Sequence, residues 1–89
     1  MCKEELIAEV AAQAGITKRV AEDAVNAVID TIIAAVSSGD KVQLNNFGTF
    51  ELKHRNARIG RKPNTGEAVP IPARDVPWFT PGHAFKERV

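Results

Sequence analysis

The sequence predicts an α+β fold: an N-terminal helical hairpin, a three-stranded antiparallel sheet with an extended β-hairpin arm, and a short C-terminal helix. Apolar residues recur at helical spacing to about residue 38, and from residue 41 they alternate with polar ones. The run from Pro63 to Gly66 is a strong turn signal between two segments. Eighty-nine residues allow one domain, 1–89. We divide it into a helical part (1–39), a sheet and arm (40–80, arm about 53–75) and a C-terminal helix (81–89).

The first helix is expected over residues 3–14, because its apolar residues fall on one stripe. These residues are Leu6, Ile7, Val10, Ala11 and Ala14. Gly15 should stop this helix, and Thr17 is a suitable N-cap for a second helix that ends near Ser38 and Gly39. The apolar stripe of the second helix is wide for a two-helix unit. We therefore interpret its surplus as a dimer interface.

Alternation predicts a short strand at Val42 to Leu44, a turn at Asn45-Asn46, and a second strand that reaches Leu52. Val69 and Ile71 should lie on a return strand, limited by Pro72, which lacks a ladder donor. Val76 to Phe79 is a further short apolar strand. Pro81 and Gly82 precede the C-terminal helix, whose expected apolar contacts are Ala84 and Phe85.

Composition excludes several classes of protein. No apolar run approaches the roughly 18 residues of a membrane helix, and charges at residues 3–5 argue against a secretory signal, so we expect a cytoplasmic protein. The single Cys2 cannot form an internal disulfide, and Cys2, His54 and His83 lack zinc-ligand spacing, so no metal or cofactor is expected. A chain this short has a marginal core, which leaves oligomerisation as its means of stabilisation.

The net charge of +1 conceals a strong asymmetry. Residues 1–50 hold four basic and seven acidic side chains, a net charge of −3, whereas residues 51–89 hold eight and four, a net charge of +4. Residues 53–74 alone carry six cations and one acid, a net charge of +5, with few apolar residues. Such a hairpin should project from the body. It is either a solvated surface hairpin or a nucleic-acid arm, and its four arginines favour the arm because guanidinium groups contact phosphate and A·T-rich minor grooves.

Four segments resemble the bacterial histone-like HU and integration host factor family, and the resemblance covers the whole chain. They are Lys41 to Leu44, Phe47 to Phe50, Ala57 to Gly66, and Val76 to Gly82. The run from Gly60 to Gly66 is the most specific, because the family usually reads Gly-Arg-Asn-Pro-x-Thr-Gly there. The resemblance is closest to HU.

The resemblance implies an intertwined dimer with two arms that embrace double-stranded DNA in the minor groove, bend it with low sequence specificity and support compaction in the nucleoid. Bent, nicked or distorted DNA would be preferred. Pro63 would be the apolar wedge that intercalates between base steps, and HU and integration host factor are themselves known examples of this mode of binding. The positions matching DNA-binding residues are Lys3, Lys53, Arg55, Arg58, Arg61, Lys62, Pro63, Asn64, Arg74 and Lys86. The expected dimer interface comprises Val28, Ile29, Ile32, Val36, Leu44, Phe47, Phe50 and Phe79.

Several residues depart from the family pattern. Asn46 replaces a common Gly and Lys62 a common Asn, while Thr80 and His83 stand where lysines are frequent. We therefore expect a grip that relies on the arms and holds flanking DNA weakly. Trp78 is unusual in its segment, and we expect it to pack in the core or dimer interface with its indole N–H partnered. Stacking on a DNA base is the less favoured alternative.

Three other interpretations stay open or are disfavoured. An integration-host-factor-like subunit would pair with a related chain and bind specific sites, so a heterodimer remains an alternative to the homodimer. A protein-interaction module would use the same arm for an acidic partner. An enzyme is not supported, because neither histidine has a spaced acid and nucleophile partner.

Overall fold

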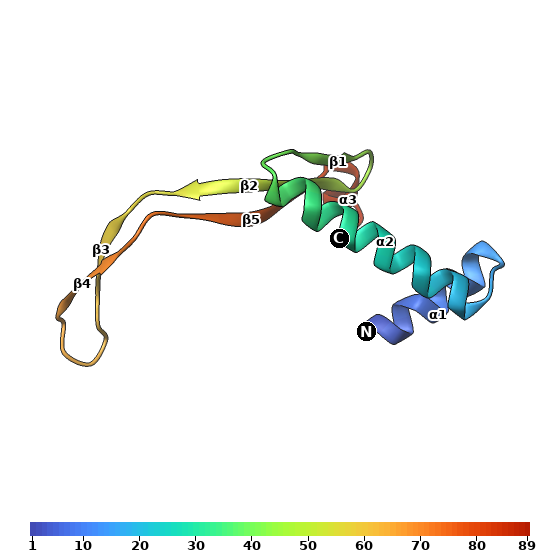
Figure 1. Cartoon of the computed structure of the whole chain (residues 1–89), viewed down its shortest axis with the longest axis horizontal. Helices are drawn as coiled ribbons and strands as arrows, with labels where there is room; N and C mark the ends of the chain where they lie inside the picture. The colour runs from blue at the N-terminus through green and yellow to red at the C-terminus, as the bar shows by residue number, and fades with distance from the viewer. The chain divides into compact units, whose positions relative to one another are not determined.

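The computed structural model describes residues 1–89 and contains three helices and five strands (Figure 1). In chain order they are α1 (Lys3–Ala14), α2 (Lys18–Ser37), β1 (Val42–Leu44), β2 (Gly48–Arg55), β3 (Arg58–Arg61), β4 (Ala68–Ile71), β5 (Arg74–Pro81) and α3 (His83–Glu87). The α+β class, with helices before an antiparallel sheet and a short helix after it, is confirmed. The chain divides into two compact units, Met1–Ala34 and Ala35–Val89, which we describe separately.

The helical unit owes its boundaries to local capping. Gly15 adopts a left-handed conformation with φ 67°, and its N–H donates to the Ala11 carbonyl, which ends α1 as predicted. The Thr17 hydroxyl accepts a hydrogen bond from the Val20 N–H at 3.2 Å, so Thr17 is the N-cap of α2. None of the helices combines the length and the apolar run that crossing a bilayer requires.

The second unit is built on the antiparallel sheet β1-β2-β5. Asn46, with φ 66°, forms the turn between β1 and β2, as its sequence context predicted. Gly48 pairs with Leu44 on one side and Pro81 on the other. A Cβ at Gly48 would lie 2.6 Å from the Phe79 ring and from the Thr80 carbonyl oxygen, so only glycine fits at this position.

The arm continues β2 and β5 outward through a second ladder, β3-β4 (Figure 1). Residues 56–57 interrupt one strand and residues 72–73 the other, where Pro72 supplies no ladder donor. The strands next to this break are longer than the sequence indicated: β2 reaches Arg55 and β5 begins at Arg74. Charged residues there complete the backbone ladder without requiring burial.

The core of the second unit is an aromatic cluster that contains all four phenylalanines of the chain. Phe50 and Phe79, paired across β2 and β5, have ring centroids 4.7 Å apart. Phe47 stacks on Phe85 of α3 with centroids 5.5 Å apart, which confirms the expected contact of the C-terminal helix. These rings fix one face of the sheet as its apolar face.

Candidate nucleic-acid interface

The two faces of the β2-β5 ribbon differ in chemistry. Directly opposed residues of an antiparallel pair point to the same face, and successive residues alternate between faces. Phe50 and Phe79 therefore share the apolar face. The opposite face carries Glu51 with Trp78 and, farther toward the arm, Lys53 with Val76 and Arg55 with Arg74. The predicted DNA-binding residues Lys53, Arg55 and Arg74 are thus brought together on one face at the base of the arm.

Arg55 and Arg74 oppose each other directly in the ladder. Like charges at such positions destabilise a sheet unless a counter-charge lies between them. Both residues, together with Arg58, line a groove at the break in the arm, whose apolar lining includes Ile71 and Pro72. This groove is a concave surface with three guanidinium groups and no acidic residue in its lining.

The four acidic side chains of residues 51–89 each have a partner within the chain. Glu51 pairs with Lys41 at 3.8 Å and Glu67 with Lys62 at 3.8 Å. The Asp75 carboxylate oxygen Oδ1 lies 3.0 Å from His54 Nδ1, and the Glu87 oxygen Oε1 lies 2.8 Å from His83 Nε2. No carboxylate lies within ion-pairing distance of the remaining cations of the arm, which are Lys53, Arg55, Arg58, Arg61 and Arg74. Their charges are free to meet an external polyanion.

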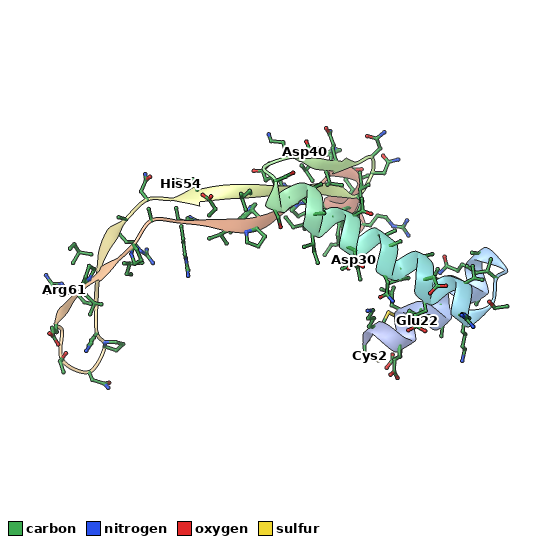
Figure 2. All side chains as sticks on the ribbon, viewed as in Figure 1. Cys2, Glu22, Asp30, Asp40, His54 and Arg61 are labelled. Atoms are coloured by element: carbon green, nitrogen blue, oxygen red, sulfur yellow. The ribbon has the colours of Figure 1, made fainter.

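The tip of the arm is a closed loop. The Gly66 N–H donates to the Lys62 carbonyl at 2.8 Å, and the Lys62 N–H donates to the Glu67 carbonyl at 3.0 Å. Arg61 also donates to the Gly66 carbonyl at 3.0 Å, so this predicted DNA-binding residue braces the loop. Neither the charge nor the spacing of these residues predicted that bond. Pro63 and Asn64 are exposed within the loop. Figure 2 shows Arg61 on the arm and His54 nearer the sheet.

Trp78 does not occupy the place expected for it. It pairs with Glu51 on the face opposite the phenylalanine cluster, and its side chain is 39% exposed. The Lys53 ammonium nitrogen lies 4.3 Å from the ring centroid, and the Arg55 guanidinium carbon lies 5.1 Å from it. The expectation of packing in the core of its own chain is therefore wrong, because one step along a strand moves a side chain to the other face. Packing in a dimer interface stays a prediction.

The other predicted residues lie on the surface or at apolar positions. Lys3 and Lys86 are exposed, on α1 and α3 respectively. Of the expected dimer residues, Val28, Ile29, Leu44 and Phe47 are exposed, whereas Ile32, Phe50 and Phe79 are half-buried and Val36 is already buried within its own chain. The structure gathers no group of three His, Cys, Asp or Glu side chains suited to a metal ion.

Comparisons with known proteins cover the whole chain. Residues 1–89 match the family described as "Bacterial DNA-binding protein". The chain is 51% identical to DNA-binding protein HU 1 of Bacillus subtilis, over 100% of this chain and 97% of that protein. It is 53% identical to DNA-binding protein HU of Geobacillus stearothermophilus, over 100% and 99%. An HU–DNA cocrystal structure from Anabaena matches with a TM-score of 0.92 and 50% identity, over 99% of this chain and 96% of that chain. HU from Thermotoga maritima matches with a TM-score of 0.69 and 32% identity, over 99% and 97%.

Proposed function

Because this chain belongs to the HU family of bacterial DNA-binding proteins, we propose that it is an architectural protein that bends double-stranded DNA and compacts it in the nucleoid. The observation that carries this proposal is the row of arm cations without carboxylate partners, two of them directly opposed as Arg55 and Arg74. Phosphates placed between these cations would remove their mutual repulsion and release counterions from the DNA. The role is one of binding and shaping DNA, without catalysis.

The arms are assigned to the minor groove. Arginine suits this groove because its guanidinium group is attracted to the negative potential of narrow A·T-rich segments. The minor groove distinguishes little beyond A·T from G·C, so binding there has low sequence specificity and follows DNA deformability. The printed description of the Anabaena relative, an HU–DNA cocrystal structure, supports DNA as the partner. Bent, nicked or otherwise distorted DNA would bind best, because less free energy is needed to bend DNA that is already distorted.

We assign the bend to Pro63. Its ring is exposed in a loop that three hydrogen bonds close, so the wedge is presented on a braced support. An apolar wedge at the end of a basic arm unstacks a base step at a cost of a few kcal/mol, which the extra contact with bent DNA offsets. Asn64, Lys62 and Arg61 would contact the backbone beside the wedge.

The remaining contacts divide between arm and body. Lys53, Arg55, Arg58 and Arg74 would hold phosphates from the arm base outward, and Lys3 and Lys86 would flank the duplex. Thr80 supplies no charge where the family often has lysine, and His83 is paired with Glu87. We therefore propose that the grip on flanking DNA is weak and that affinity gains little on long duplexes.

The working unit is proposed to be a homodimer. Only three apolar side chains are buried within one chain, those of Ala11, Ala21 and Val36, which is too little core for a stable domain of this length. Val28 and Ile33 on α2 are 55% and 57% exposed. A partner chain that covers this apolar surface would supply the missing core.

The test is the DNA bend angle, measured by energy transfer between dyes at the two ends of a duplex. Pro63→Ala should keep most of the salt-dependent affinity and reduce the bend. Pro70→Ala is the matched control, because Pro70 is also an exposed proline of the arm but lies within the β3-β4 ladder opposite Ile59. An unchanged bend in Pro63→Ala would refute the wedge. The mass of the purified protein, measured in parallel, distinguishes the homodimer from a subunit that requires a different chain.

A further inference from the structure

Trp78 is an aromatic residue on the charged face of the ribbon. Its partner Glu51, the diagonal neighbour Lys53 and the next outward residue Arg55 all share its face. The phenylalanine cluster occupies the other face, so Trp78 adds nothing to that core. No hydrogen bond joins its indole N–H to another residue, and the residue is 39% exposed. The indole is therefore accessible to a ligand that approaches this face.

Two cations lie against the indole. The Lys53 nitrogen is 4.3 Å and the Arg55 guanidinium carbon 5.1 Å from the ring centroid. Cation–π contacts at exposed sites are weak, about 0.5–1 kcal/mol each, but they hold long side chains close to the ring. The result is a compact patch, defined by Lys53, Arg55 and Trp78, in which two positive charges lie over one indole ring.

We propose that this patch binds the wall of the DNA groove at the arm base, with Trp78 as a direct DNA contact. The inference rests on the proposed function and extends it to a residue outside the arginine set. The sugar–phosphate strand offers a matching sequence of groups: an apolar deoxyribose between two phosphates. The indole packs on the sugar, while Lys53 and Arg55 move from the ring to the phosphates on either side.

The patch is suited to a groove wall and not to the base stack. Trp78 lies within a regular ladder, with paired residues on both sides along β2 and β5. Lys53 and Arg55 lie over its ring, so the ring does not project alone between base pairs. Pro63, by contrast, lies at a loop tip. The two apolar contacts would therefore act at different points: the proline within a base step and the indole on a sugar.

The first experiment uses the intrinsic fluorescence of the wild-type protein. Trp78 is the only tryptophan and the chain has no tyrosine, so the emission reports this patch alone. Titration with an unlabelled duplex should shift the emission maximum to shorter wavelength, because DNA displaces water from the indole. Pro63→Ala should show the same shift, since its patch is intact. An emission spectrum that DNA leaves unchanged, while anisotropy of a labelled duplex reports binding, overturns the inference and leaves the proposed function standing.

The second experiment measures affinity at several salt concentrations. Trp78→Ala should bind about tenfold more weakly, as loss of a buried aromatic contact does, with the salt dependence of wild type. Lys53→Ala should instead make the salt slope shallower. Trp78→Phe should retain most of the affinity, and it covers the case in which the alanine variant does not fold. Arg19→Ala, an exposed arginine on α2 outside the arm, is the control and should bind like wild type.

The outcomes separate the two proposals. Trp78→Ala that folds and binds within about twofold of wild type contradicts the patch. So does a Trp78→Phe variant as weak as the alanine variant, because a flat apolar ring would then be insufficient. A wild-type protein that binds no duplex at all overturns the proposed function and this inference together.

Discussion

Arg58 provides the sharpest test of the arm as the DNA-binding element. It is exposed at the start of β3, pairs with Ile71 only through the backbone ladder, and has no carboxylate partner. Replacing it by alanine therefore breaks no ion pair within the protein and should leave the fold intact. Any effect on DNA binding then reports the lost positive charge.

The size of the effect follows from the number of free cations. Each arm carries five cations without a carboxylate partner: Lys53, Arg55, Arg58, Arg61 and Arg74. If four or five of them neutralise phosphates in each of two chains, the slope of log K against log salt is about −7 to −9. Arg58→Ala removes two phosphate contacts from a dimer, so its slope should be shallower by about 1.8.

The assay is fluorescence anisotropy of an end-labelled duplex between about 50 and 200 mM KCl, a range over which the wild-type affinity should fall by about four to five orders of magnitude. Arg19→Ala is the matched control, because Arg19 is also an exposed arginine but lies on α2, outside the arm. Equal slopes for wild type and Arg58→Ala would refute the reasoning. A slope change in Arg19→Ala as large as that in Arg58→Ala would also refute it, since binding would then not be confined to the arms.

Two further predictions concern the scaffold. Gly48→Ala should lower the free energy of unfolding by about 1–3 kcal/mol, because its Cβ would lie 2.6 Å from the Phe79 ring and from the Thr80 carbonyl oxygen. Gly60→Ala should lower the free energy of unfolding by less, because the one close contact of its Cβ, at 2.8 Å, is with the flexible end of Ile71. Urea unfolding at one protein concentration measures both, and equal costs would contradict the steric argument. Thr17→Ala should cost about 1 kcal/mol by removing the N-cap, while Thr17→Ser should unfold thermally like wild type; a Ser variant as unstable as the Ala variant would show that the cap bond to Val20 is unimportant.

Local chemistry made much of the fold predictable. Gly15, Thr17 and Asn46 act within a few residues of themselves, through a left-handed backbone or a single side-chain hydrogen bond. The turn at Gly66 is of the same kind, with φ 71°. Such features depend on residue type and immediate neighbours, so the sequence contains nearly all the information that decides them.

The face of Trp78 was not predicted, because it depends on pairing between distant strands. Val76 and Phe79 are both apolar but lie on opposite faces of β5, so the segment shows no clean alternation. Size and hydrophobicity then suggested burial for Trp78. Only the pairing of Glu51 with Trp78 shows which face it shares. The bond from Arg61 to the Gly66 carbonyl was missed for a related reason, since it depends on how the loop closes.

The register of β2 against β5 connects the core to the candidate DNA-binding face. Phe50 must oppose Phe79 for the aromatic cluster to form, and this same register places Lys53 and Arg55 on the other face. A slip of one residue would exchange the two faces and drive cations among the phenylalanine rings. Gly48 opposes such a slip, because any other residue in its place would collide with Phe79 and the Thr80 backbone. An uncharged residue near the sheet end of the ribbon therefore helps to determine where the cations of the arm base point.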